Sequence, residues 1–480
     1  MHIKRRVSGW LTLAVLAVGG TMVASDPAFA KVDMDQLTIG GEARIRYEGR
    51  INTSLNSNVP ANENAASHRI RVNVGYDLTP DVSFFAQIQD ARNYGGESGA
   101  PATGSGIASV SSANLGNTGV DLHQGYILVK NLGLPGLSLK AGRQEIMYGD
   151  HRLFGNFNWS QVGNSFDAVK LMYSTPTADV DVFWARIADT EALSSASGVI
   201  FPANGTKGTQ DQNIYGAYVT LKVVPNWTIE PYYFLLQDTR NAVVGVFNTT
   251  PQAPDQTRST VGGRINGKVA GLDATGELAW QFGGMASGNA GNNHDLHINA
   301  EAAAFRAGYT FEPVPMRPRV GIEVTYASGS GCTTTCGKNN TFDNLFPTNH
   351  FKFGAMDLGS WRNMVTYQGV FDVKPDAVSK LQVNVVLLRL ANHHDNWYRA
   401  GQTVYGVTGA ANTASSIGRE LDVHYWRTFK EKFKAEIGLG HFWAGDYLRP
   451  SNGNAINGGV AGTTNGSGES WGYVMGSVLF

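Results

Sequence analysis

Beyond its first 30 residues, the sequence lacks any run that approaches the ~20 consecutive apolar residues needed for a membrane-spanning helix. Charged residues are also scarce, at 16% of the chain, against roughly 25% in soluble domains. Lysine and glutamate, the usual surface residues of helices, are sparse, whereas glycine is frequent at 58 residues. These shortages argue against a helical membrane protein and against an ordinary soluble domain.

The sequence also has no strong excess of either charge, with a formal net charge of −1. A chain without a global electrostatic bias has no general attraction to nucleic acid or to other polyanions. We therefore expect no nucleic-acid partner, and any charge selectivity must come from the placement of individual side chains.

Cysteine is rare, with two residues in the whole chain, Cys332 and Cys336. They lie four positions apart in a segment rich in glycine and threonine. In an oxidising compartment this spacing indicates a local disulfide that staples a loop. A metal site would need further ligands nearby, and none are evident.

Residues suited to catalysis or metal binding occur without the spacing that would select them. His393, His394 and Asp395 resemble the start of a metal site, but they fall in an expected external loop beside Trp397. No serine lies in a G-x-S-x-G motif at an expected strand-to-helix turn, where a hydrolase would place its nucleophile. We expect no metal, no other cofactor and no enzyme activity.

The first 30 residues have the three parts of a secretory signal. Lys4, Arg5 and Arg6 are followed by an apolar stretch (residues 10–24) and by an Ala-Phe-Ala cleavage site (residues 28–30). We expect residues 1–30 to be a signal peptide and residues 31–480 to be the mature protein.

From residue 37 onward, the apolar residues recur with a period of two. Ile45 and Tyr47 alternate with Arg44 and Arg46, and the same alternation continues in segments such as 69–76, 273–282 and 319–326. Helical spacing never persists. The pattern predicts one β-strand after another.

Short and long connections alternate between these strands. Tight links, for example at 79–80 and 134–136, are separated by long segments such as 93–120 and 328–360. Short periplasmic turns and long extracellular loops are typical of an outer-membrane barrel. The sequence therefore predicts one transmembrane antiparallel β-barrel of about eighteen strands over residues 31–480, in the cell outer membrane.

The alternation also determines which face each charge occupies. An arginine that faces lipid at the membrane midplane costs roughly 2–4 kcal/mol, so we expect six arginines in the lumen: Arg44, Arg46, Arg69, Arg71, Arg264 and Arg319. They could simply pair with lumen carboxylates, or they could form a mixed ladder that holds anionic solutes. A barrel of this size conducts unless a loop plugs it.

Eight segments spread over most of the chain form a recognisable series: DLHQGYILVK (121–130), KAGRQEIMYGDHRLFG (140–155), NSFDAVKLMY (164–173), VTYASGSG (324–331), LFPTNHFKFGAMDLGSWRN (345–363), NHHDNWY (392–398), GRELDVHYW (418–426) and GLGHFWAGDYL (438–448). The series resembles the alginate-export family of outer-membrane porins. The resemblance implies an eighteen-stranded barrel with a positively charged constriction that passes an anionic uronate polymer outward.

The same resemblance adds three residues to the expected pore lining. Arg143 matches the arginine of the family's GRQ motif, and Asp150 and Arg152 match its YGD-x-R segment. Strict alternation would put Arg143 on the lipid side, in phase with Ala141. A lumen-facing Arg143 therefore requires a β-bulge near Gly142.

The sequence thus favours a channel for passive passage of an anionic polysaccharide, such as an alginate-like uronate, or of its oligomers, selected by lumen arginines. The expected partners are outer-membrane lipid, the polysaccharide or small anionic solutes, and periplasmic polymer-synthesis machinery. Two alternatives stay open. One is a diffusion porin for general or small solutes, and the other is an adhesion or structural protein with a plugged lumen.

Overall fold

The computed structural model of the chain describes residues 33–94, 120–189, 211–239, 256–286, 296–331, 337–456, 459–460 and 462–480. The expected signal peptide and both Cys332 and Cys336 lie outside these residues, so the cleavage site and the disulfide stay predictions. The chain divides into two compact units, Met1–Leu37 and Thr38–Phe480. In the first unit the described residues form a short 3-10 helix, η1 (Met34–Gln36), with Asp33 as its N-cap.

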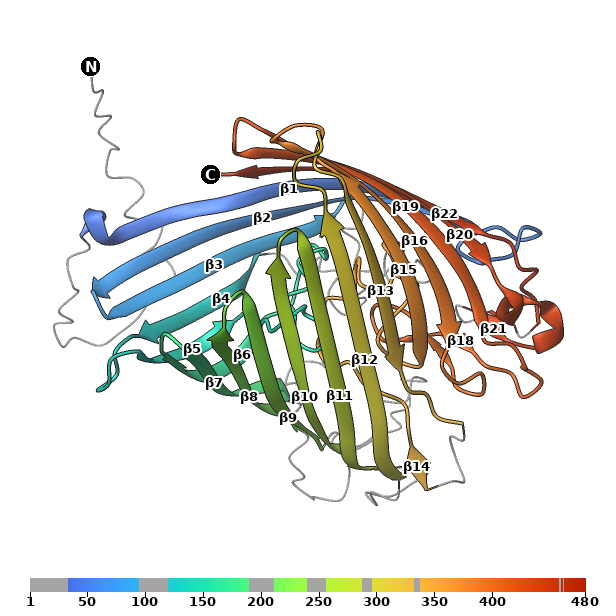
Figure 1. Cartoon of the computed structure of the whole chain (residues 1–480), viewed down its shortest axis with the longest axis horizontal. Coiled ribbons are helices and arrows are strands. Elements are labelled where there is room, and N and C mark those ends of the chain that lie inside the picture. Colours follow the sequence, from blue (N-terminus) through green and yellow to red (C-terminus); the bar gives the residue numbers. More distant parts are fainter. Residues whose placement is uncertain are drawn as a thin grey trace, which may run out of the picture. The chain divides into compact units, whose positions relative to one another are not determined.

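Eighteen long antiparallel strands form the second unit within the described residues (Figure 1). Each pairs with the next along the chain, and β1 pairs with β22, which closes the sheet into a barrel. The strands are β1 (Leu37–Ile51), β2 (Asn62–Thr79), β3 (Val82–Asn93), β4 (Val120–Val129), β5 (Leu137–Gln144), β6 (Phe166–Ser174), β7 (Ala178–Asp189), β8 (Asp211–Val224), β9 (Trp227–Asp238), β10 (Gln256–Val269), β11 (Leu272–Met285), β12 (Leu296–Thr310), β13 (Arg319–Ala327), β15 (Met364–Val373), β16 (Ser379–Leu390), β19 (Ser416–Phe429), β20 (Phe433–Ala444) and β22 (Glu469–Leu479). The predicted barrel of eighteen strands is confirmed.

The remaining elements are short and lie in the connections. A two-residue strand, β14 (Lys338–Asn339), adds parallel to β12. A small three-stranded sheet joins β17 (Trp397–Tyr398), β18 (Val404–Val407) and β21 (Ala455–Ile456), and two 3-10 turns, η3 (Asp446–Leu448) and η4 (Pro450–Asn452), follow β20. Within the described ranges, no helix has the length and apolar character to span a bilayer.

The two ends of the barrel differ in the length of their connections. Two residues join β2 to β3 and β8 to β9, whereas 21 residues (145–165) join β5 to β6 at the opposite end. The closing pair of strands matches Glu42 with Leu479, so Phe480 lies at the short-turn end. In outer-membrane barrels the short turns are periplasmic and the long loops are extracellular.

The wall has one apolar face and one polar face, as the period-two pattern predicts. On β1, Ile45 and Tyr47 are 58% and 55% exposed, whereas Arg44 and Arg46, which alternate with them, are each 7% exposed. The apolar outer face suits lipid. The buried inner residues are covered by chain that enters the barrel.

That chain consists of the described residues of four long connections: the β5–β6 loop (residues 145–165), the β13–β15 loop (328–363), the β16–β19 loop (391–415) and the β20–β22 loop (445–468). The first two are joined by a parallel bridge between Phe154 and Phe346, with a hydrogen bond of 2.9 Å from the Gly155 N–H to the Phe346 carbonyl. The loops therefore pack on one another as well as on the wall.

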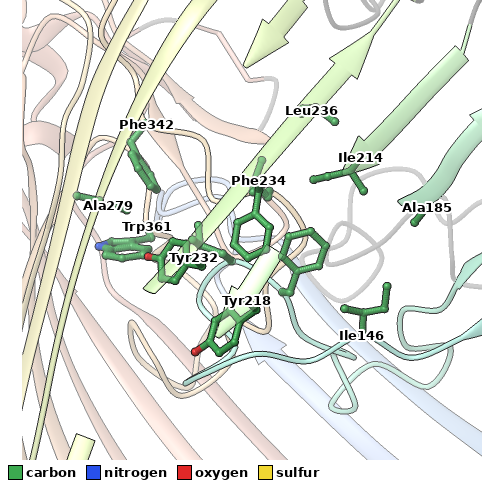
Figure 2. Close-up of a cluster of buried hydrophobic side chains, with 14 of the residues drawn as sticks. Ile146, Ala185, Ile214, Tyr218, Tyr232, Phe234, Leu236, Ala279, Phe342 and Trp361 are labelled. Atoms are coloured by element: carbon green, nitrogen blue, oxygen red, sulfur yellow. The ribbon is translucent and has the colours of Figure 1, made fainter. Parts of the chain in front are cut away.

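Two hydrophobic clusters hold these loops against the inner wall. In the first, Phe342 and Trp361 of the β13–β15 loop pack with Tyr232 and Phe234 of β9 (Figure 2). The second gathers residues of all three later loops, including Trp397, with β16, β20 and β22. Apolar burial in this barrel thus lies inside the lumen, where an open pore would hold water.

The assignment of the two faces can be tested with neighbouring residues of β2. Val72 pairs with Ile88 on the outer face, and Asn73 faces inward. We expect Val72→Lys to lower the free energy of unfolding by about 2–4 kcal/mol, because a lysine there faces lipid. Asn73→Lys should change it much less. Denaturant titration in phospholipid vesicles measures both, and equal losses would contradict the assignment.

Candidate functional site

Four arginines on the inner face of β1 and β2 bind the backbone of the β5–β6 loop. Each guanidinium group donates a hydrogen bond to a backbone carbonyl oxygen of the loop. Arg44 bonds to Asn158 at 2.7 Å, Arg46 to Trp159 at 2.8 Å, Arg69 to Ser160 at 3.1 Å and Arg71 to Val162 at 3.1 Å. We call these four residues the arginine stripe. The structure thus places all four in the lumen, with the loop as their main acceptor.

Three carboxylates form ion pairs with the four guanidinium groups of the arginine stripe. Glu42 is shared by Arg44, at 2.9 Å, and Arg69, at 2.6 Å. Glu48 lies 3.2 Å from Arg46 but also contacts a further buried arginine on β1. Because backbone carbonyls carry no formal charge, the hydrogen bonds that the stripe donates to the loop leave its positive charge in place.

The fourth arginine of the stripe meets a carboxylate of the β5–β6 loop. Glu145 lies 3.5 Å from Arg71 and 3.0 Å from the His123 ring nitrogen. Burial alone would raise the pKa of Glu145, but hydrogen bonds from His123 and Asn156, together with the charge of Arg71, lower it. Glu145 therefore stays ionised and anchors the start of the loop.

An aromatic contact completes this anchor. The guanidinium carbon of Arg46 lies 4.1 Å from the centre of the Trp159 ring, and Trp159 stacks on His350 of the β13–β15 loop at 3.9 Å. A cation over an indole face is attracted by the ring's negative surface. The stripe therefore orders both loops.

A second ionic network joins three more of the predicted residues. Asp150 lies 2.7 Å from Arg264 of β10, and Arg152 lies 2.6 Å from Glu323 of β13. Burial would raise the pKa of Asp150, but Lys352 and the arginines around it lower the pKa to about 2. Asp150, Arg152 and Arg264 thus lie together and fix the β5–β6 loop to the opposite wall.

Arg319 lies apart from both networks. It is at the start of β13, at the short-turn end, where it pairs with Asp273 at 2.6 Å and Asp372 at 3.7 Å. It faces the lumen near the periplasmic mouth of the barrel.

The prediction of a lumen-facing Arg143 was wrong. The ladders of β5 with β4 and with β6 are unbroken, and Arg143 pairs with Asp167 in phase with the exposed Val169. Gly142 has φ +126°, but it serves close packing, since a Cβ there would lie 2.3 Å from the Gly125 carbonyl oxygen. Without a bulge the side chain stays on the outer face.

The outward position of Arg143 is stabilised by its partner. Asp167 accepts two hydrogen bonds from the guanidinium, at 2.9 and 3.2 Å. The sequence held this signal, because Asp167 alternates with lumen residues in the same way as Val169 and Leu171. Two opposite charges in outward phase on neighbouring strands indicate a pair on the outer wall.

A polar cavity of about 540 Å³ lies on the inner side of the wall beneath the β5–β6 loop. Its lining includes Tyr148, Asp181, Lys222 and Arg264. The Tyr148 hydroxyl and Lys170 each approach Asp181 at 3.0 Å. Of these, only Arg264 was among the predicted site residues. Lys170 could have been predicted to face the lumen, because it alternates with the apolar residues Val169 and Leu171.

The anchoring role of the arginine stripe can be tested with Arg69. We expect Arg69→Ala to speed amide exchange across residues 156–163, because each lost charge-assisted hydrogen bond contributes about 1.5–3 kcal/mol. Arg143→Ala is the control, since an exposed pair contributes about 0–1 kcal/mol. Hydrogen–deuterium exchange with mass spectrometry measures the difference. Unchanged exchange in Arg69→Ala would contradict the role.

Known structures share this architecture at low sequence identity. The outer membrane protein OprD from Pseudomonas aeruginosa is 10% identical, with a TM-score of 0.54 over 96% of this chain and 98% of that one. OccAB1 from Acinetobacter baumannii is 11% identical, with a TM-score of 0.56 over 95% and 99%. At this identity the likeness shows the fold. None of the curated proteins matches the chain.

The sequence itself matches one family model. The alginate export model covers residues 35–461, which is most of the chain. The family and the fold are those of a channel rather than of an enzyme. The chain therefore belongs to the alginate-export family and is an outer-membrane β-barrel channel.

Proposed function

We propose that the channel passes an anionic polysaccharide, an alginate-like uronate, or its oligomers, and that the arginine stripe selects for negative charge. The observation that carries the proposal is the shared Glu42, which gives Arg44 and Arg69 one carboxylate between them. The excess positive charge lies in a region shielded from water, where electrostatic effects are strong.

The chemistry of the stripe suits a uronate. A guanidinium presents a planar fork of donors that binds a carboxylate through two parallel hydrogen bonds. The carbonyls of residues 158–162 are neutral acceptors, so a carboxylate competes well for the same donors. In the proposed passage the polymer replaces the β5–β6 loop on the stripe, and the loop returns when the polymer has left.

A second candidate is a diffusion channel for small anionic solutes. It is favoured by the packing inside the barrel, where two hydrophobic clusters and four loops occupy much of the lumen beside a polar cavity of about 540 Å³. A cavity of that size takes a small sugar acid but no long polymer. The same packing is also compatible with the third alternative, an adhesion or structural protein whose lumen is plugged.

Passive passage has no energy source of its own, so the direction of transport would have to be set by a partner protein. We propose that export is driven by periplasmic polymer-synthesis machinery that delivers the chain to the barrel. Residues 1–30 would direct the protein to this compartment as a signal peptide.

Single-channel currents in planar bilayers separate these candidates. We expect an anion-biased reversal potential in a salt gradient, and block by uronate oligomers but not by neutral oligosaccharides of equal length. Block by single sugar acids alone would support the small-solute channel. An absence of any current would leave the plugged protein and reject both channels.

Substitutions in the arginine stripe test whether it sets the anion preference of the channel. We expect Arg44→Gln with Arg69→Gln to lower the anion preference severalfold, because two guanidinium charges are removed from the lumen wall. Arg143→Gln should leave it unchanged, since that side chain faces outward. The reversal potential measures both, and equal shifts in the two proteins would overturn the role of the stripe.

A further inference from the structure

Two arginines on neighbouring strands point away from the lumen at the long-loop end of the barrel. Arg389 is the last residue but one of β16, and Arg419 is the fourth residue of β19. Both are exposed, whereas Leu388 and Glu420, which alternate with them, are fully buried. Both guanidinium groups therefore lie on the membrane-facing side of the wall.

The strand register places the two residues near the same end of neighbouring strands, with a register shift between Leu388 and Arg389. Arg419 pairs directly with Leu387, and Arg389 lies two residues farther along the same strand. On its other side Arg419 pairs with Trp443 of β20, and its guanidinium carbon lies 5.4 Å from the centre of that ring. We call Arg389, Arg419 and Trp443 the outer-wall arginine patch.

The patch has no carboxylate partner among the described residues, which sets it apart from other charges on this rim. Arg143 is paired with Asp167, and Asp90 is paired with His68 and Arg92. Within the described part of the chain Arg419 contacts the Trp443 ring, and neither arginine forms an ion pair. The positive charge of the two arginines is therefore available to an anionic ligand outside the protein.

The surroundings of the patch are apolar. Below it, toward the membrane centre, the outer face presents Val385, Leu387, Val423 and Leu439, with exposed fractions between 38% and 61%. An arginine facing lipid is costly at the midplane, but the cost falls near the interfaces. A tryptophan at a strand end is typical of the level of the lipid head groups. The patch therefore lies where a head group meets acyl chains.

We propose that the outer-wall arginine patch binds the phosphorylated head group of an acylated glycolipid of the outer leaflet. The long-loop end faces outward in outer-membrane barrels, so the lipid comes from that leaflet. Guanidinium groups bind phosphate oxygens through paired hydrogen bonds. The acyl chains lie along Leu387, Val423 and Leu439, and the Trp443 ring lies beside the sugar. This inference is independent of the transported substrate.

Native mass spectrometry of the full-length mature barrel in mixed micelles tests the proposal. The probes are bisphosphorylated lipid A, its dephosphorylated form, phosphatidylglycerol and inorganic phosphate. We expect the unaltered protein to bind bisphosphorylated lipid A about tenfold more tightly than the dephosphorylated form, because charge-assisted hydrogen bonds are lost with the phosphates. The two arginines should account for most of this difference.

Three variants test whether the two arginines cause the preference for phosphorylated lipid A. Arg389→Gln with Arg419→Gln should remove the preference for phosphate, and Arg389→Lys with Arg419→Lys should keep part of it because the charge remains. Arg143→Gln is the matched control, an outward arginine on the same rim whose charge is already paired, and should bind like the unaltered protein. Heat-dependent migration on a gel verifies that each variant forms a folded barrel.

Several results would overturn the proposal. Equal lipid A binding by the glutamine double variant and the unaltered protein would remove the patch from the site. Displacement of lipid A by equimolar inorganic phosphate would assign the patch to free phosphate. Binding of phosphatidylglycerol as tight as that of lipid A would show a general anionic surface without preference for the glycolipid.

Discussion

Four guanidinium groups buried on the inner wall need acceptors, and the backbone of residues 158–162 supplies them. An unpaired buried charge is strongly destabilising, so the β5–β6 loop and the arginine stripe stabilise each other. With this loop inside, the β13–β15 loop can stack His350 on Trp159 and pack its aromatic residues on the wall. The filled lumen follows from that first set of hydrogen bonds.

The same side chain has three uses in this barrel, and its surroundings decide which. In the lumen, Arg44 and Arg69 share one carboxylate and bind neutral carbonyls, so positive charge remains. On the outer wall, Arg143 is neutralised by Asp167. Arg389 lies on the same outer rim without such a partner among the described residues. Residue type alone would have treated all of them alike.

Alternation in the sequence was sufficient to predict the strands and the face of most charges, because the cost of placing charge in lipid constrains each strand locally. The predicted lumen position of Arg143 was wrong because it followed the family's GRQ motif rather than the alternation, in which Arg143 shares the outward phase of Ala141 and Asp167. The inward fold of the loops could not be predicted. It depends on contacts such as Arg44 with Asn158, 114 residues apart, which no local pattern encodes.

The bridge between Phe154 and Phe346 makes the two inner loops one mechanical unit. Backbone hydrogen bonds join Gly155 to Phe346 and Phe346 to Leu153, so a loop that moved alone would break them. Local opening in proteins proceeds through such contiguous cooperative units. In the proposed passage the two loops should therefore leave the inner wall together, in one cooperative step.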